Sequence, residues 1–363
     1  MRMMGFGLRF AAIGLAAAAA SVGLSAQDRP AGPTFDSAGT VHVPAFALPP
    51  SELMSDEAKA FMKLRSKMPV ALPQQQEPDI ATRRRQIDTM LGSRVALMQQ
   101  LFPVDVADQT IGGVHTRVIT PKSGGYDRDR ILVNLHGGGF TLCWEACSML
   151  ESLPISSLGR YKVVTVDYRM APEAAHPAGV EDAAAVYRAL LKTYKAKHIG
   201  IYGCSAGGAL TAEAAAWLPA HGLPQAGAIG IFGAGAIRFG AGDSAYVAGY
   251  IDGSFPPPPT DGSPAADITR GYFARVDMRD PIVSPALHPD MLAKFPPTLI
   301  ITGTRAMDMS PAIVTNSRLI KAGVPSTLIV GEGMGHCYMY MPNLPESRDA
   351  YDAIVAFFRK NLL

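Results

Sequence analysis

The pentapeptide GCSAG at residues 203–207 constrains the fold of this chain more than any other segment. It fits G-x-S-x-G, the pattern of a serine held on a sharp turn between a strand and a helix. Glycine is needed beside that serine because a side chain would not tolerate the crowding or the backbone torsions. The flanking residues agree with this interpretation, since a strand-like run over 198–203 precedes the motif and a helical run over 206–217 follows Ser205.

Short apolar runs alternate with helical runs from residue 104 onwards. ILVNL, KVVTV and TLIITG are apolar almost throughout, which is typical of strands in a parallel sheet covered on both faces. The fold class predicted is therefore α/β, with a mostly parallel central sheet and helices on both faces. We predict strands at 104–110, 114–120, 130–135, 161–167, 198–203, 226–232, 298–303 and 326–331, and helices at 147–158, 179–195, 206–217, 310–322 and 346–361.

The residues before 104 do not share this alternation. Residues 27–50 are rich in Pro, Gly and small side chains and predict an extended arm. Two amphipathic helices are expected next, one capped by Ser51 and running to Met68, the other capped by Asp79. The second helix carries an apolar face made of Ile87, Met90, Leu91, Val95 and Met98. We assign 27–103 to this arm and to cap helices, and 104–363 to the main domain.

Residues 236–280 interrupt the main domain with glycines, with four prolines at 256–259 and with RGYFARV at 270–276, which is expected to be helical. Ligands of open α/β sheets bind outside the carboxyl ends of the strands. We therefore interpret this segment as a cap insertion over that edge.

The first 26 residues predict a signal peptide. Arg2 and Arg9 give a basic start, an apolar run covers 10–24, and small residues precede Gln27. A membrane anchor is the alternative, but the run of about 15 residues is shorter than the roughly 20 needed to span a bilayer. We expect a periplasmic or secreted protein with no stable membrane insertion after processing.

Composition and charge exclude several partners. A formal net charge of +2 and the lack of any Lys/Arg stripe argue against a nucleic-acid partner, and the three arginines at 83–85 are interpreted as a solvated helix face. The sequence has no Cys/His cluster with zinc spacing and no phosphate-binding GK[ST] loop, so neither a metal nor a cofactor is expected. Nothing in the sequence indicates the oligomeric state.

A second glycine motif, HGGGF at 136–140, follows the strand-like run RILVNL. Consecutive glycines let backbone amides approach a developing negative charge without obstruction by side chains. Alone, the motif could be a flexible turn. Together with G-x-S-x-G about 70 residues later, it favours an oxyanion hole formed by the N–H groups of Gly138, Gly139 and Ala206.

Four segments resemble the hormone-sensitive lipase family of bacterial α/β-hydrolase esterases: HGGGF, DYRMAPEAAHPAGVED (167–182), GCSAGG (203–208) and DPIVSP (280–285). The resemblance runs from about residue 100 to the C-terminus. It implies an α/β-hydrolase fold with a helical cap and a small-molecule ester substrate, cleaved by a serine carboxylesterase or acetyl hydrolase without a cofactor. For Tyr168, Arg169 and Glu173 it implies a buried, ion-paired support beneath the oxyanion loop.

The acid of the expected Ser-His-acid triad departs from the family pattern. Relatives that read GTRD have the acid where this chain has Ala306. We predict Asp308, two residues further on, because it keeps the order serine, acid, histidine that this fold uses. Glu332, four residues before His336, is the rival, and Asp280 is a more distant third. A diminished or absent acid remains a further alternative.

The predicted chemistry is two-step acyl transfer. His336, in GMGHCY after a strand-like run, takes the proton of Ser205, and the serine attacks the ester carbonyl. Asp308 then stabilises the imidazolium. One alternative is a hydrolase of an amide, a carbamate or a lactone. Another is a ligand-binding protein that has lost the chemistry, such as the plant gibberellin receptors of similar fold. The other seven histidines are interpreted as structural, with His136 helping to orient the oxyanion loop.

Two cysteines adjoin the expected catalytic residues, and Cys204 stands where the family usually has Asp. Cys204 precedes Ser205 and Cys337 follows His336, a pairing similar to that of tannases and fungal feruloyl esterases, in which a bridge joins these positions. The resemblance implies a Cys204–Cys337 disulfide, and an exported chain with an even set of four cysteines is compatible with it. Two buried free thiols are the alternative. Cys143 and Cys147 are a possible second, local pair.

Overall fold

A computed structural model describes residues 32–65, 79–252, 255–261 and 263–363. The chain divides into two units, Met1–Pro49 and Pro50–Leu363. The described part of the first unit holds two short antiparallel strands, β1 (Thr34–Phe35) and β2 (Val41–His42), whose residues are exposed. The predicted signal peptide lies outside the described residues.

The second unit is built on an eight-stranded sheet with the order β10-β9-β8-β7-β5-β6-β4-β3. Its strands pair in parallel, except that β4 is antiparallel to both β3 and β6. All the predicted strands are present, with ends displaced by at most three residues. The strands are β3 (Val104–Ile111), β4 (Val114–Pro121), β5 (Asp127–Leu135), β6 (Tyr161–Val166), β7 (Ile199–Cys204), β8 (Ala228–Phe232), β9 (Thr298–Gly303) and β10 (Ser326–Gly331).

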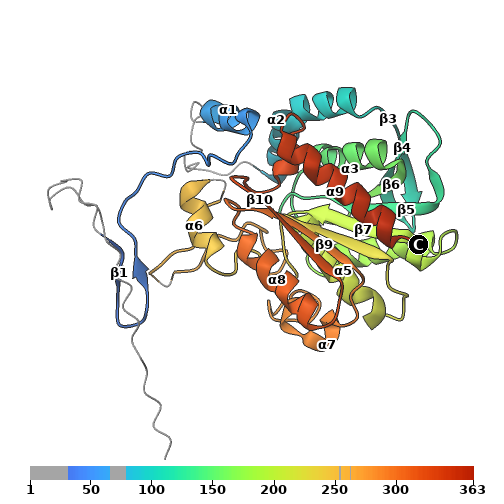
Figure 1. Ribbon diagram of the computed structural model, residues 1–363. Coiled ribbons are helices and arrows are strands. Elements are labelled where there is room, and N and C mark those ends of the chain that lie inside the picture. The colour runs from blue at the N-terminus through green and yellow to red at the C-terminus, as the bar shows by residue number, and fades with distance from the viewer. Residues whose placement is uncertain (1–31, 66–78, 253–254, 262) are drawn as a thin grey trace, which may run out of the picture. The chain divides into compact units, whose positions relative to one another are not determined.

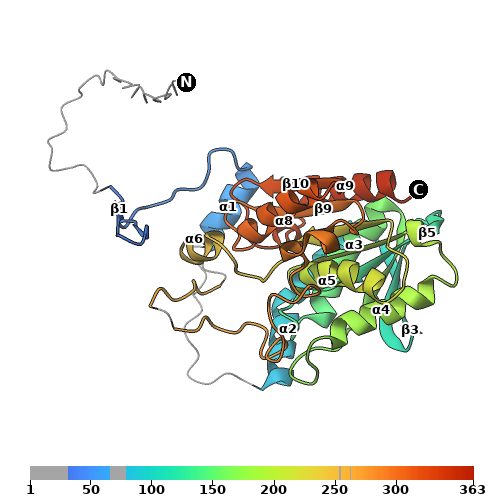
Figure 2. The ribbon, with the colours of Figure 1, turned by 90° about the horizontal axis from the view of Figure 1, so that it is seen from below.

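Helices cover both faces of this sheet (Figures 1 and 2). On the upper side in Figure 1 lie α2 (Ile80–Leu101), α3 (Trp144–Gly159) and α9 (Pro345–Asn361), and on the lower side lie α5 (Ala206–Ala220) and α8 (Met309–Lys321). Alternate residues of β5 enter the two cores: Ile131 and Val133 pack with α4, α5 and α8, whereas Leu132 packs with α2, α3 and α9. This is the burial expected for apolar strands of a covered parallel sheet. The helices are α3 (Trp144–Gly159), α4 (Ala178–Leu190), α5 (Ala206–Ala220), α8 (Met309–Lys321) and α9 (Pro345–Asn361), with the shorter η1 (Ala196–His198), η2 (Pro285–Leu287), α7 (Pro289–Leu292) and η3 (Tyr338–Tyr340).

Both helices predicted before the sheet are present, as α1 (Asp56–Arg65) and α2 (Ile80–Leu101). The cap predicted for the first was wrong: the hydroxyl of Ser55, not Ser51, accepts a hydrogen bond from the helix, from the N–H of Ala58. The predicted end of that helix, Met68, lies outside the described residues. Asp79 caps α2 through Thr82 N, as predicted.

The predicted apolar face of α2 is correct except at one position. Leu91 and Met98 are buried, and Ile87 and Val95 pack against the same core. Met90 is instead 65% exposed.

The segment 236–280 differs from its predicted secondary structure. Its helix is α6 (Ser244–Ile251), whereas RGYFARV forms turns and is not helical. The side chain of Asp267 accepts hydrogen bonds from Thr269 N and Gly271 N, and both Arg270 and Gly271 have positive φ angles of 50° and 85°. Left-handed residues end a helix, so this loop-closing aspartate overrides the local helical pattern.

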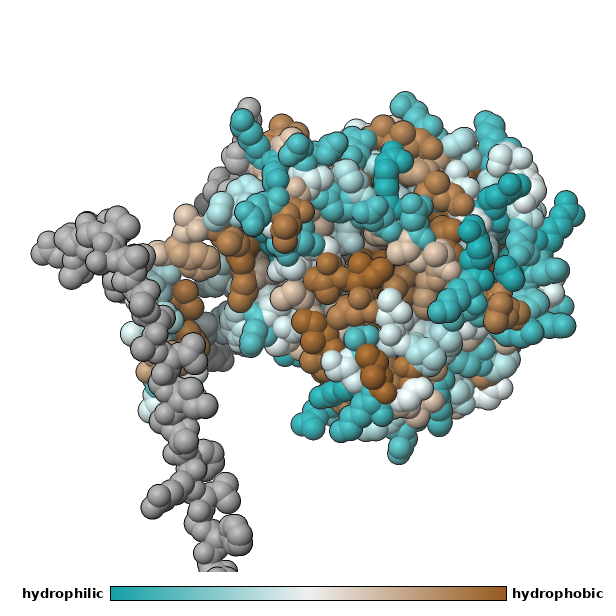
Figure 3. All heavy atoms as spheres, viewed as in Figure 1, coloured by the Kyte–Doolittle hydropathy of each residue, from teal (hydrophilic) through white to brown (hydrophobic). Residues whose placement is uncertain are grey.

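The strand β10 forms one edge of the sheet, and its side chains remain partly exposed. Val330 of β10 and Ile313 and Ile320 of α8 are exposed. Apolar residues gather near the centre of the face shown in Figure 3. Among the helices of the described residues, none is both long enough and apolar enough to cross a bilayer.

The turn at Ser205 is as tight as the sequence motif predicts. Ser205 has φ 60° and ψ −123°, a strained conformation between β7 and α5. A Cβ atom on Gly207 would lie 1.8 Å from the carbonyl oxygen of Leu135, and one on Gly203 would lie 2.0 Å from the same oxygen. The last residue of β5 therefore sits against both glycines, and no larger residue fits at either position.

We expect Gly207→Ala to lower the free energy of unfolding by about 3 kcal/mol or more, because the added methyl group meets backbone atoms that cannot move aside cheaply. Gly92→Ala is the matched control. A Cβ at Gly92 meets nothing within 4 Å, and alanine favours the helix by up to about 1 kcal/mol. Chemical denaturation measures both changes, and equal stability of the two variants would contradict this account of the turn.

Candidate active site

The site lies at one edge of the sheet, where the carboxyl ends of its parallel strands meet. Ser205 follows β7, and the glycine loop 136–140 follows its neighbour β5. Asp308 comes after β9, and His336 comes after β10. The strand order therefore brings together four loops that are far apart in the sequence.

Ser205, His336 and Asp308 form one hydrogen-bonded chain. The Nε2 atom of His336 lies 2.9 Å from Ser205 Oγ, and its Nδ1 atom lies 2.6 Å from Asp308 Oδ1. Both distances are within hydrogen-bonding range. The imidazole thus contacts a hydroxyl on one side and a carboxylate on the other, which is the arrangement of a serine nucleophile, its base and the orienting acid.

Asp308 is the carboxylate that contacts His336. Its side chain is fully buried and also accepts a hydrogen bond from Thr302 Oγ1 on β9. Glu332 is exposed. Asp280 accepts a hydrogen bond from Ile282 N in its own loop. Of the three carboxylates weighed from the sequence, the structure brings Asp308 to His336.

A cavity of about 570 Å³ opens in front of Ser205. Gly139 and Ala206 line it beside the serine, and much of the remaining wall comes from residues between 237 and 283. The rings of Phe239 and Phe255 lie 5.5 and 5.2 Å from the His336 ring, edge to face. The base is therefore shielded by aromatic groups on the cavity side.

The glycine loop at 136–140, the expected oxyanion loop, is held in place by contacts that involve His136 and Tyr168. His136 stacks on Tyr168 with ring centroids 4.4 Å apart, and Tyr168 donates a hydrogen bond to the His136 carbonyl. Burial lowers the pKa of His136 to about 4, so its imidazole is neutral. Tyr168 is thus a buried support beneath the loop, as the family resemblance implied.

The interpretation of the three arginines at 83–85 as a solvated helix face was wrong for Arg84, whereas Arg85 is exposed. Arg84 of α2 donates hydrogen bonds to the carbonyl groups of Thr141 and Ala171 and to both carboxylate oxygens of Glu173. It ties the N-terminal helix to the end of the oxyanion loop. Arg169 pairs with Asp182 and Glu181 at the start of α4. The side chains of Arg169 and Glu173 are 55% and 57% exposed, so the buried setting that the resemblance implied for these two residues was wrong.

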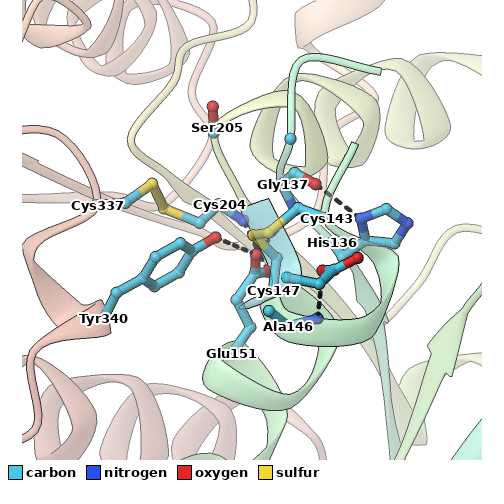
Figure 4. Close-up of a disulfide and its surroundings, with 12 residues drawn as sticks. His136, Gly137, Cys143, Ala146, Cys147, Glu151, Cys204, Ser205, Cys337 and Tyr340 are labelled. Atoms are coloured by element: carbon cyan, nitrogen blue, oxygen red, sulfur yellow. Dashed lines mark hydrogen bonds between the residues drawn. A yellow bond between two sulfur atoms is a disulfide. The ribbon is translucent and has the colours of Figure 1, made fainter. Parts of the chain in front are cut away.

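One buried carboxylate, that of Glu151 on α3, connects three of the four loops. Gly137 N and Tyr340 Oη donate to its Oε1 atom, and Cys204 N and Asn134 Nδ2 donate to its Oε2 atom. Figure 4 shows the backbone of Gly137, the backbone of Cys204 and the phenol of Tyr340 converging on Glu151, while Ser205 points away from it. Burial raises the pKa of Glu151 to about 7, although these hydrogen bonds oppose the rise.

Two disulfides flank this carboxylate. Cys204 and Cys337 are bonded, with Cα atoms 6.4 Å apart, as are Cys143 and Cys147, with Cα atoms 5.2 Å apart. The first joins the neighbour of Ser205 to the neighbour of His336. Gly233, after β8, makes room for it: a Cβ there would lie 2.8 Å from Cys337 Sγ.

Comparison with known proteins agrees with this geometry. Residues 132–340 match a protein family described as having the alpha/beta hydrolase fold. An acetyl-hydrolase of Streptomyces hygroscopicus is 32% identical over 234 residues, which cover 63% of this chain and 75% of that protein. A versiconal hemiacetal acetate esterase of Dothistroma septosporum is 28% identical over 255 residues, covering 68% and 77%.

Solved structures give the same result. The esterase E25 superimposes with a TM-score of 0.74 at 28% identity, covering 89% of this chain and 99% of that chain. An esterase from the bacterial hormone-sensitive lipase family gives a TM-score of 0.71 at 27% identity, covering 85% and 98%.

The chain thus belongs to the matched family of α/β-hydrolases. Within that class it groups with the hormone-sensitive lipase family esterases, and it is a carboxylic ester hydrolase, as the sequence motifs had implied.

We expect Glu151→Gln to lower kcat for ester hydrolysis at least about tenfold, because the amide NH₂ would face donors that now point at a carboxylate oxygen. The stability of the variant should also depend less on pH. In the parent, the folded-state pKa of about 7 lies above the ordinary value, so the folded state binds the extra proton and stability falls as pH rises from about 4.5 to 7.

Glu145→Gln, an exposed position on the same helix, is the control for this variant. Urea unfolding at several pH values and steady-state kinetics give the two readouts. A Glu151→Gln protein with kcat within twofold of the parent and an unchanged pH slope would rule out a positioning role for the carboxylate.

Proposed function

We propose that this protein is a serine carboxylesterase that acts on small acyl esters, acetates among them, with Ser205, His336 and Asp308 as its catalytic triad. The observation that carries the proposal is the continuous chain from Ser205 Oγ to His336 Nε2 and from His336 Nδ1 to Asp308 Oδ1. A retired ligand-binding protein has no need of this alignment, which favours the enzyme.

The reaction follows from the positions of these groups. His336 Nε2 takes the proton of Ser205 as Oγ attacks the ester carbonyl, and the imidazolium then protonates the departing alcohol. In the second half, water attacks the acyl carbonyl and loses a proton to the same nitrogen. The imidazolium then returns that proton to Ser205 Oγ as the bond between Oγ and the acyl carbon breaks, which releases the acid. Asp308 keeps Nδ1 protonated and stabilises the positive charge on the ring, more effectively because it is buried.

The negative charge on the tetrahedral intermediate needs hydrogen-bond donors. We assign this role to the N–H groups of Gly138, Gly139 and Ala206. Support comes from Gly139 and Ala206 lining the cavity next to Ser205, and from Gly137 being fixed by Glu151. Donors held in place before the reaction stabilise the developing charge without having to reorient.

The similarity of this chain to two relatives favours esters of small acyl groups as its substrates. Two of its relatives are an acetyl-hydrolase and an acetate esterase by name. The same triad could cleave an amide, a carbamate or a lactone, and a panel of these substrates against p-nitrophenyl esters of increasing chain length separates the possibilities.

We further propose that residues 1–26 direct export and that the protein acts in the periplasm or outside the cell. The two cysteine pairs at bonding distance support this location, because disulfides persist in oxidising compartments. Cell fractionation with N-terminal sequencing of the mature chain tests it.

A fluorophosphonate probe tests the nucleophile directly. The purified parent should be labelled at Ser205, and Ser205→Ala should lose both labelling and at least about a thousandfold in kcat for p-nitrophenyl acetate. The circular dichroism spectrum should not change, since alanine removes an oxygen only. Hydrolysis by Ser205→Ala within tenfold of the parent would overturn the proposal.

The acid is tested by a matched pair of amide substitutions. Asp308→Asn should lower kcat by about a thousandfold or more, because an amide cannot stabilise the imidazolium at Nδ1. Glu332→Gln should retain kcat within about twofold, since its side chain is exposed and Asp308 holds the histidine. The reverse ranking in steady-state assays would assign the role to Glu332.

A further inference from the structure

Two phenylalanines in the cavity wall have no role in the proposed mechanism beyond shielding His336. Phe239 belongs to the loop after β8, and Phe255 belongs to the segment after α6. Their ring centroids lie 5.5 and 5.2 Å from that of His336 and 5.7 Å from each other. Both residues line the cavity and both are half-buried, so a bound ester can contact the two rings.

The surrounding backbone holds these two rings in place. Arg238 N, one residue before Phe239, donates a hydrogen bond to Oγ of the fully buried Ser284. Four prolines follow the second ring, and a Cβ atom at Gly249 of α6 would lie 2.8 Å from Pro257 N, so the proline run packs closely against that helix. Proline has a fixed φ angle and lacks an N–H group. This part of the wall is therefore stiff and carries no backbone donor.

The mechanism decides which part of the ester lies against the two rings. In the first half of the reaction, His336 Nε2 protonates the departing alcohol, so the alcohol oxygen must come within hydrogen-bonding distance of that nitrogen. The carbon atoms attached to this oxygen then lie beside the imidazole. The alcohol part of the ester, rather than the acyl part, therefore meets Phe239 and Phe255. This step rests on the proposed function, because it takes His336 as the acid that protonates the leaving group.

The size of the cavity leaves most of its space to the alcohol. Its volume of about 570 Å³ lies within the range that holds drug-sized ligands. An acetyl group, or another small acyl group, fills only a minor part of such a volume. The rest is available to the alcohol, and phenylalanines and prolines make up much of its wall.

We propose that Phe239 and Phe255 form the alcohol-binding subsite, and that the preferred substrates are esters of alcohols that carry an aromatic ring. The planes of the two phenylalanine rings are 72° apart. A third ring that lies parallel to one of them is therefore nearly perpendicular to the other, so it stacks on the first and meets the second edge to face. Both arrangements are favoured between aromatic rings and add to the gain from buried area. A saturated ring obtains the gain from area alone.

The experiment compares two acetates whose alcohols differ only in the aromaticity of a ring: phenethyl acetate and its ring-saturated counterpart, cyclohexylethyl acetate. Both are esters of primary alcohols and both give the same acetyl-enzyme, so a difference in kcat/KM reports the contacts of the ring during acylation. The parent should show kcat/KM at least about fivefold higher for the phenethyl ester, although the cyclohexyl ester is the more apolar.

Variants identify the source of this preference. Phe239→Leu and Phe255→Leu should each lower the ratio of the two kcat/KM values at least about twofold, and the double variant should bring it to about one. Phe255→Tyr keeps an aromatic face and should retain most of the ratio. Tyr250→Leu is the matched control, because this aromatic residue of α6 is 80% exposed and lies outside the cavity lining. Its ratio should equal that of the parent.

A second pair of esters tests the assignment of the subsite to the alcohol. Methyl hydrocinnamate and its ring-saturated counterpart carry the ring on the acyl group. Their ratio of kcat/KM values should be the same in the double variant as in the parent, because the acyl group does not meet these two rings.

The subsite is overturned by a ratio below about twofold for the acetates in the parent, or by a double variant that loses kcat/KM equally for both acetates, as a structural defect would. A ratio that responds to the double variant only in the acyl pair would overturn it too. Failure of the proposed function is a different result, in which neither acetate is hydrolysed and the fluorophosphonate does not label Ser205. Labelling of Ser205 in each variant shows that its active site is folded.

Discussion

The active site depends on the hydrogen bonds that meet at the buried carboxylate of Glu151. They come from the oxyanion loop at Gly137, from the nucleophile turn at Cys204 and from Tyr340 beyond the histidine. Each loop follows a different strand, and a loop end alone has no reason to hold its position to a fraction of an ångström. A shared acceptor restrains the positions of all three loops, because moving any one of them leaves a hydrogen-bond donor unsatisfied in a buried site.

The disulfide between Cys204 and Cys337 acts on the same loops by a different physical means. Hydrogen bonds to Glu151 fix the nucleophile turn in the folded state, whereas the bridge limits the separation of the serine and histidine loops before they are packed. Glu151, reaching in from α3, supplies the acceptor for the backbone N–H of Cys204.

The sheet and the residues brought together around Ser205 were predictable because their signals are local. Apolar runs such as ILVNL identify strands, and a glycine-flanked serine between a strand and a helix identifies the turn. Asp308 was predictable only as the better of several carboxylates, since its contact with His336 depends on how the loop after β9 folds. The helix expected over RGYFARV was wrong because one side chain, that of Asp267, closes a turn that periodicity does not reveal.

Glu151, Arg84 and Glu213 escaped sequence analysis for a common reason: each is a single polar residue whose partners come from distant parts of the chain. In sequence, Glu151 and Glu213 look like ordinary helical residues, and only their burial sets them apart. The partners of Glu151 and Glu213 distinguish the two residues. The carboxylate of Glu151 has hydrogen-bond donors for both oxygens, as a structural role requires, whereas Glu213 pairs with His176 across 3.4 Å.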